Sequence, residues 1–256
     1  MTEIAIVKDQ ADAGRIAADL IVAALGRRVD PTLGLATGST PLPVWAALAE
    51  RSLDLSAVRG FALDEYVGLP AGHPESYRAV VDRDIVGPLG LDPALVRVPG
   101  DDEGPLAEAG ERYEAAITAA GGIDLQILGI GRTGHIGFNE PGSSLASRTR
   151  LKALTPATRA DNARFFDSID DVPTHCLTQG IGTILDAGAL VLLAFGESKA
   201  PAVAAAVEGP LTSSCPASAI QLHRRAVVIV DEAAASQLEH RDYYRFAWDH
   251  REIATT

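Results

Sequence analysis

Short apolar runs alternate with stretches of helical periodicity along this chain, and this alternation constrains the fold more than any other feature. A run of about four to eight apolar or β-branched residues is typical of a buried strand, whereas apolar residues three and four apart are typical of a helix. Ala18, Ile21, Val22 and Leu25 form one such helical stripe. The runs expected to form strands are residues 4–7, 33–36, 58–63, 125–130, 190–195 and 227–230.

This repeated order of strand and helix predicts an α/β fold, with a mostly parallel sheet covered by helices on both faces. The chain has 256 residues, 47% of them hydrophobic, and no shift in composition divides it. We therefore expect a single domain over residues 1–256. In such a fold, ligands bind beyond the carboxyl ends of the strands.

Composition excludes several classes of function. A formal net charge of −12 argues against a nucleic-acid partner, which requires a clustered basic surface. The longest apolar run, residues 189–195, is far shorter than the ~20 residues of a membrane-spanning helix, and the amino terminus lacks the pattern of a leader. Cys176 and Cys215 have no metal-ligand spacing and suit a reducing compartment. A cytoplasmic protein without a metal, a membrane or a nucleic acid is expected.

The segment 124–144 carries a strand pattern directly into glycines, with no helix pattern after it. Gly129, Gly131 and Gly134 have the spacing of a dinucleotide-binding fingerprint. That motif requires a helix that starts at the third glycine, and Pro141, together with two more glycines, breaks any such helix. We therefore expect no nicotinamide cofactor.

His135 and Glu140 lie in the same segment and are candidates for acid/base chemistry. The unperturbed pKa of histidine, near 6.5, suits proton transfer at neutral pH, and the flanking glycines give the imidazole little local apolar cover. We interpret His135 as functional. The other five histidines lack a comparable setting, and surface or packing roles are expected for them.

Within residues 33–48, an apolar strand leads through Thr37, Gly38, Ser39 and Thr40 into a proline that can open a helix. Such a turn presents backbone amides and hydroxyls to an anion. It is not a Walker A loop, because the lysine and the glycine spacing are absent. An ordinary strand-to-helix turn is the alternative.

Within residues 58–69, an apolar strand is expected to end at Asp64 and Glu65. Adjacent strand residues point to opposite faces, so the two carboxylates are not expected to share one site. A carboxylate beside apolar walls at the end of a strand can have its pKa raised into the range useful for proton abstraction. A turn or capping aspartate is the alternative.

Taken together, these segments resemble the glucosamine/galactosamine-6-phosphate isomerase family, which includes glucosamine-6-phosphate deaminases. The resemblance spans roughly residues 33–231. The matching strings are LGLATGSTP, ALDEYVGLPAGHPESY, GHIGFNEPGSSLASRTRLKALT, NARFFD, LTQGIGTILDA, GESKAPAVAAAVEG and AIQLH. DEYVGL and GHIGFNEP are the most specific, whereas the glycine-threonine turn alone would match many phosphate-binding proteins.

The resemblance implies a Rossmann-like α/β fold and a cofactor-free conversion of glucosamine 6-phosphate and water into fructose 6-phosphate and ammonia. By matching position, Asp64 would move the proton between C2 and C1, and His135, with Glu140 as polar partner, would assist ring opening. The residues expected at the substrate phosphate are Thr37, Gly38, Ser39, Thr40, Arg164 and Lys199.

Two further features of the resemblance concern the pKa of His135 and a second phosphate pocket. The family often has an aspartate or asparagine two residues before the histidine, where this chain has Thr133, which cannot supply a negative charge. Ser143, Arg150 and Lys152 align with a second phosphate pocket that binds N-acetylglucosamine 6-phosphate in some members. Because the family includes hexamers and monomers, the resemblance leaves open whether this chain is a homo-oligomer.

Alternatives remain at the level of sequence. Arg164 and Lys199 could be surface charges on amphipathic helices, and Arg150 and Lys152 could belong to a solvated basic strand. A lactonase related to 6-phosphogluconolactonase would share the fold without needing Asp64 as a C2 base. A sugar-phosphate sensor would bind without releasing ammonia. The preference between glucosamine and galactosamine 6-phosphate is not determined by these motifs.

Overall fold

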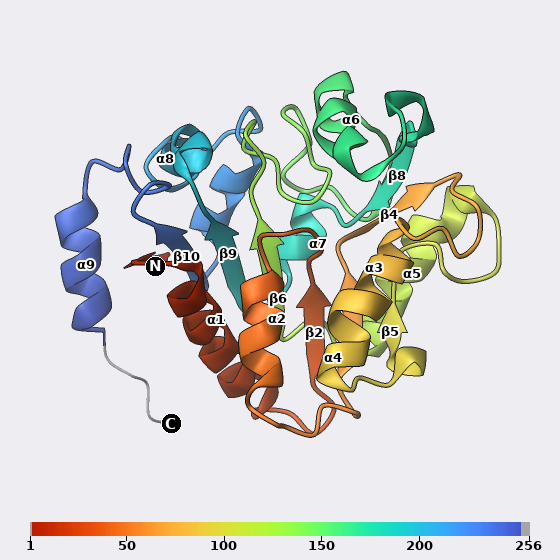
Figure 1. Cartoon of the computed structure of the whole chain (residues 1–256), viewed down its shortest axis with the longest axis horizontal. Helices are drawn as coiled ribbons and strands as arrows, with labels where there is room; N and C mark the ends of the chain where they lie inside the picture. Colours follow the sequence, from red (N-terminus) through yellow and green to blue (C-terminus); the bar gives the residue numbers. More distant parts are fainter. Residues whose placement is uncertain (1, 252–256) are drawn as a thin grey trace.

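The computed structural model describes residues 2–251, and its centre is a seven-stranded sheet in which every pair of neighbouring strands is parallel. The strand order is β1-β10-β9-β6-β2-β3-β5 (Figure 1). All six strands expected from the sequence are present, which confirms the α/β prediction. The strands are β1 (Glu3–Val7), β2 (Thr32–Leu35), β3 (Arg59–Ala62), β5 (Val96–Arg97), β6 (Leu125–Gly129), β9 (Leu190–Ala194) and β10 (Ala226–Asp231).

Helices pack on both sides of this sheet, as expected for strands that are buried on both faces (Figure 1). α1 (Gln10–Leu25) begins after Asp9, whose carboxylate accepts a hydrogen bond from Asp12 N, and it packs beside α2 (Leu42–Ala49). The stripe predicted for α1 faces the core, with Ala18, Ile21 and Leu25 buried. The remaining α-helices are α3 (Tyr77–Val81), α4 (Gly87–Leu89), α5 (Ala109–Ala119), α6 (Pro156–Asn162), α7 (Ile181–Leu185), α8 (Ala200–Val207) and α9 (Arg241–Asp249).

Several short 3₁₀- and π-helical segments connect these elements. A π-helical turn, η1 (Asp82–Val86), joins α3 to α4. The 3₁₀ turns are η2 (Pro93–Leu95), η3 (Leu106–Glu108), η4 (Ala163–Phe165), η5 (Ile169–Asp171), η6 (Glu197–Lys199) and η7 (Pro216–Leu222). Within residues 2–251, no helix has both the length and the apolar character needed to cross a bilayer.

A second, three-stranded antiparallel sheet lies beyond the carboxyl ends of the parallel strands, and the sequence patterns did not predict it (Figure 1). It consists of β4 (Asp64–Val67), β8 (His175–Thr178) and β7 (Arg150–Ala153), in the order β4-β8-β7. One face packs on a small separate core that includes Tyr66, Phe138 and Cys176.

The two sheets are joined at Leu63, the single residue between β3 and β4. Its N–H donates to Leu35 O of the parallel sheet at 3.1 Å, and its carbonyl accepts from Gln179 N, directly after β8, at 2.7 Å. Leu63 is therefore hydrogen-bonded to both sheets. Asp64 follows it immediately.

Candidate active site

Four neighbouring strands of the parallel sheet, β9-β6-β2-β3, bring the predicted site residues to one edge. Parallel strands end at the same edge of a sheet, so the loops that follow them are neighbours. The loop after β2 carries residues 37–40, and Asp64 follows β3. The loop after β6 carries His135, and Lys199 follows β9.

Asp64 is the first residue of β4, and its side chain is buried, with 8% of the residue exposed. Burial, and then the negative charge of Glu65, raise the pKa of Asp64 to about 8. Glu65 points elsewhere and accepts hydrogen bonds from Tyr77 N at 2.9 Å and Arg78 N at 2.8 Å, at the start of α3. This confirms the expectation that the carboxylates of Asp64 and Glu65 do not share one site.

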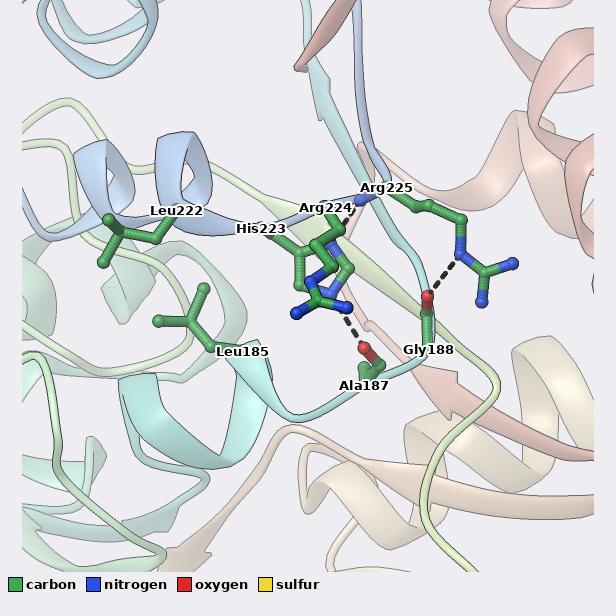
Figure 2. A pocket seen from close by; sticks show the side chains of 7 residues that line it. All are labelled: Leu185, Ala187, Gly188, Leu222, His223, Arg224 and Arg225. Atoms are coloured by element: carbon green, nitrogen blue, oxygen red, sulfur yellow. Dashed lines mark hydrogen bonds between the residues drawn. The ribbon is translucent and has the colours of Figure 1, made fainter.

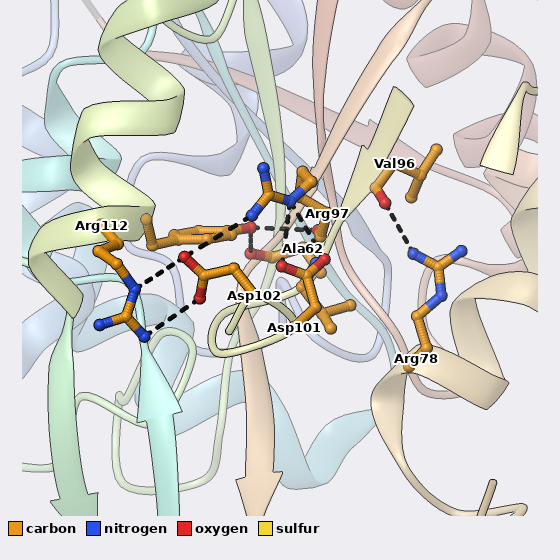
Figure 3. A network of polar contacts seen from close by, with 9 residues as sticks. Ala62, Arg78, Val96, Arg97, Asp101, Asp102 and Arg112 are labelled. Atoms are coloured by element: carbon orange, nitrogen blue, oxygen red, sulfur yellow. Dashed lines mark hydrogen bonds and ion pairs between the residues drawn. The ribbon is translucent and has the colours of Figure 1, made fainter. Parts of the chain in front are cut away.

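A polar network holds the end of β3 (Figure 3). The Tyr113 hydroxyl donates to Ala62 O at 2.7 Å, and Gln179 Nε2 donates to the same carbonyl at 3.1 Å. Arg97 and Arg112 lie beside it in ion pairs with Asp101 and Asp102 (Figure 3). Ala62, which precedes Leu63, is thus held by the side chain of Tyr113 from α5 and the side chain of Gln179 next to β8.

The loop that carries His135 packs directly against Asp64. A Cβ atom added to Gly137 would lie 3.6 Å from Asp64 Oδ2 and 3.0 Å from Thr178 Oγ1. The Thr178 hydroxyl accepts a hydrogen bond from Phe138 N at 3.1 Å, and Thr178 pairs with Asp64 across the small sheet. The structure therefore brings Asp64 and the histidine loop together, although about seventy residues separate them in sequence.

Two glycines of this loop leave the space that the His135 imidazole occupies. A Cβ on Gly131 would lie within 2.5 Å of three atoms of the His135 ring, so only glycine leaves room for the ring there. Gly134 has a φ of +79° and lies against Cys215, so a side chain at that position would be strained as well as crowded. No helix follows these glycines before α6, in agreement with the rejection of a dinucleotide motif.

His135, Glu140 and Thr133 form one hydrogen-bonded group. His135 Nδ1 lies 3.3 Å from Glu140 Oε2 and 2.9 Å from Thr133 Oγ1. The Thr133 hydroxyl also lies 3.1 Å from Glu140 Oε2 and donates to it. Burial opposes ionisation of Glu140, but hydrogen bonds from His135 and Thr158 lower its pKa to about 2. The group can therefore supply an ionised carboxylate to orient the imidazole.

The loop after β2 has the geometry expected of an anion-binding turn. Gly38 has a φ of +87° and open space where a side chain would be. Gly38 and Ser39 are exposed, Thr37 and Thr40 are half-buried, and α2 begins two residues later after Pro41. The turn can offer amides and hydroxyls to a phosphate.

Three cations gather beside this edge. Lys199 Nζ donates to Ile130 O, at the end of β6, at 2.8 Å. Burial, and then the nearby guanidinium groups of Arg132 and Arg164, lower the pKa of Lys199. Arg132 pairs with Asp161 of α6 at 2.5 Å, whereas Arg164 is exposed and lies 4.7 Å from the ring centroid of Phe165. Sequence reasoning missed Arg132, because its contact is with a residue 29 positions away.

The residues assigned to a regulatory pocket are only partly brought together. Arg150 and Lys152 are half-buried on one face of β7 and belong to the cross-strand rows of Asp64 and Tyr66. Ser143 is buried in the histidine loop, and its N–H donates to Glu140 O at 3.0 Å. Among the described residues, the Ser143 hydroxyl has no hydrogen-bond partner, so it is not bonded to either cation.

A cavity of about 550 Å³ lies elsewhere on the molecule (Figure 2). Its walls come from the segments that precede β9 and β10, at the edge of the sheet opposite Lys199. His223 Nε2 faces Ala187 O at 2.7 Å, and Arg225 Nε donates to Gly188 O at 3.0 Å. Burial of His223 in this wall confirms a packing role for it. Among residues 2–251, no three histidine, cysteine or carboxylate side chains cluster as metal ligands would.

Comparison with known proteins yields close relatives over the whole chain. A glucosamine-6-phosphate deaminase of Bifidobacterium longum subsp. infantis is 58% identical, over 98% of each chain. One of Rhodococcus opacus is 56% identical, over 97% of each chain. A solved structure described as a monomeric glucosamine-6-phosphate deaminase superposes with a TM-score of 0.88 at 38% identity, covering 92% of this chain and all of its own.

More distant structures share the fold. The 6-phosphogluconolactonase of Thermotoga maritima is 20% identical, with a TM-score of 0.72, covering 91% of this chain and all of its own. The family model for glucosamine-6-phosphate isomerases and 6-phosphogluconolactonase matches residues 9–229. This chain belongs to the glucosamine-6-phosphate isomerase/6-phosphogluconolactonase family.

Proposed function

We propose that this protein is a glucosamine-6-phosphate deaminase, which converts glucosamine 6-phosphate and water into fructose 6-phosphate and ammonia. Full-length relatives with that name at 54–58% identity support this function, whereas the lactonase is similar only at the level of the fold. The structural observation that carries the proposal is the packing of the His135 loop against the buried carboxyl group of Asp64.

The phosphate would anchor the substrate at residues 37–40, with Lys199 and Arg164 supplying positive charge. A helix start and charged donors are general features of phosphate sites, and charge-assisted hydrogen bonds contribute about 1.5–3 kcal/mol each. The positions of the turn and of Lys199, after strands on either side of β6, support binding across the loop that carries His135.

His135 would assist the opening of the pyranose ring. The imidazole would transfer the proton that leaves the C1 hydroxyl to the ring oxygen, giving the open-chain aldehyde. The contact of Nδ1 with Glu140 and Thr133 leaves Nε2 to meet the sugar.

Asp64 would then carry out the isomerisation. The carboxylate would remove the proton from C2 of the open-chain amino sugar, while a proton released by the substrate's own ammonium group passes to the C1 oxygen, so that an enolamine with a hydroxyl at C1 would form. Return of the proton to C1 gives an iminium group at C2, water adds to that carbon, and ammonia leaves. A buried carboxylate with a raised pKa is a suitable base for this step, and general base catalysis contributes about 10²- to 10⁴-fold.

Ammonia release from purified protein tests the proposal, with glucosamine 6-phosphate and galactosamine 6-phosphate as separate substrates. We expect release from at least the first, and a loss of about 10³-fold or more in Asp64→Asn, which keeps the size of the side chain but cannot accept the proton. Substrate binding without ammonia would identify a sensor instead, and hydrolysis of 6-phosphogluconolactone a lactonase. The cytoplasmic location inferred from the cysteines stays a prediction.

A further inference from the structure

Two segments of the chain contact the side chain of Glu140, and only one of these segments is the histidine loop. Oε2 faces His135 Nδ1 and the Thr133 hydroxyl. Oε1 accepts hydrogen bonds from the hydroxyls of Thr158 and Thr155, the latter at 3.4 Å. Both of these threonines belong to the beginning of α6, so this helix contacts the acid/base group directly.

Helix capping alone does not require this arrangement. Thr155 is the N-cap of α6, and its hydroxyl oxygen accepts a hydrogen bond from Thr158 N at 3.2 Å. That bond caps the helix without the Thr158 hydroxyl. The Thr158 hydroxyl instead contacts Glu140, 18 residues away, and only 6% of Thr158 is exposed.

The contacts also fix the direction in which Glu140 points. A carboxylate with donors on one oxygen only can rotate about its terminal torsion. Donors on Oε1 from α6 leave Oε2 as the atom that faces the imidazole. A second contact joins α6 to the loop at the other end of the helix, where Asp161 pairs with Arg132.

We propose that Thr158, with support from Thr155, is a positioning residue for ring opening: it holds Oε1 of Glu140 so that Oε2 orients His135. α6 is therefore part of the acid/base machinery and does not only cover it. This inference rests on the proposed function for its kinetic readout, but the contact between Thr158 and Glu140 can be measured without any turnover.

Two substitutions at Thr158 separate the hydroxyl from the shape of the side chain. Thr158→Val keeps the branched shape and removes the donor, and Thr158→Ser keeps the donor. Thr118→Val is the control for the substitution itself, because within residues 2–251 the exposed Thr118 hydroxyl donates only to Glu114 O of its own helix, α5. Melting temperatures of the three variants show whether each is folded.

The first readout is the titration of Glu140, followed by NMR of protein labelled at the glutamate side-chain carboxyl carbon. In the unmodified chain the pKa of Glu140 is about 2. We expect it to rise by about one unit in Thr158→Val, because a donor to the ionised form is lost. It stays in place in Thr158→Ser and in Thr118→Val.

The second readout is the rate of ammonia release. We expect Thr158→Val to lower kcat by about 10-fold and to change KM little. Thr158→Ser restores kcat. Equal activity and an unmoved Glu140 titration in Thr158→Val would overturn the proposal, as would a uniform loss in both variants with an unmoved titration. If the unmodified chain released no ammonia, the proposed function would fail, and the titration would still decide whether Thr158 holds Glu140.

Discussion

A buried carboxyl group is costly to ionise, and Asp64 has a pKa near 8 because of this cost. Its folded-state pKa lies above that of the unfolded chain, near 3.8. The folded protein therefore holds a proton that the unfolded chain has lost. Relative to the unfolded chain, this stabilisation is complete below pH 4 and is lost as the pH rises toward 8.

Asp64→Asn should remove this dependence at the scale of a single residue. We expect the variant to melt at a higher temperature than the unmodified protein at pH 9, by about 4–10 °C, because no charge is buried there. The difference should shrink toward pH 5. Differential scanning calorimetry across this range measures it, and a constant difference at all pH values would contradict a raised pKa for Asp64.

The same pKa predicts that kcat/KM of the unmodified enzyme rises with pH up to about 8.

Among the elements, α3 depends on a carboxylate outside it. Glu65 of β4 accepts hydrogen bonds from Tyr77 N and Arg78 N, and Tyr77 in turn stacks on Tyr66 with ring centroids 4.8 Å apart. The start of α3 is thus tied to the small sheet through Glu65.

Loss of this tie should destabilise the fold. We expect Glu65→Ala to reduce the free energy of unfolding by about 1–3 kcal/mol, since two backbone donors of α3 lose their acceptor. Urea denaturation measures the change. Glu111→Ala, which removes an exposed carboxylate from the first turn of α5, is the control and should cost less than about 0.5 kcal/mol. An equal effect of both substitutions would count against a capping role for Glu65.

The elements also show what the sequence could predict. Most of the parallel strands were recognisable because they are buried on both faces and read as continuous apolar runs, whereas β5 has only two residues and was not predicted. The small sheet was not, since β4 and β7 alternate between buried or half-buried and more exposed residues over only four positions. Its strands also come from segments far apart in sequence, and local periodicity does not contain such pairings.

The candidate site divides in the same way. Asp64, His135 and Glu140 were recognisable because each follows a strand in an unusual setting, and the roles proposed for them stay predictions. Thr158 and Arg132 were not recognisable. Their hydroxyl and guanidinium groups are ordinary helix and surface features until the chain folds back on the histidine loop.

At the scale of the whole molecule, two cations of the small sheet bear on regulation by a second ligand. Arg150 and Lys152 lie on one face of β7, and burial lowers the pKa of Arg150. A half-buried cation offers local positive charge to a phosphate even in a chain of net charge −12. A solved relative is described as monomeric, so regulation through subunit contacts does not follow from family membership.

We expect N-acetylglucosamine 6-phosphate to convert a sigmoidal dependence on substrate concentration into a hyperbolic one, and Arg150→Gln to abolish the response. Steady-state kinetics with and without this compound measure the effect, and light scattering of the same samples gives the oligomeric state. Arg27→Gln, an exposed substitution on the loop after α1, is the control. Hyperbolic kinetics that the compound leaves unchanged would remove the regulatory hypothesis.

The single residue between β3 and β4 has a mechanical consequence. Leu63 is bonded to Leu35 on one side and to Gln179 on the other, so a shift of either sheet is passed to the residue that precedes Asp64. Substitutions that are remote from the sugar but move either sheet would therefore act on the angle of proton removal, to which reaction rates are steeply sensitive.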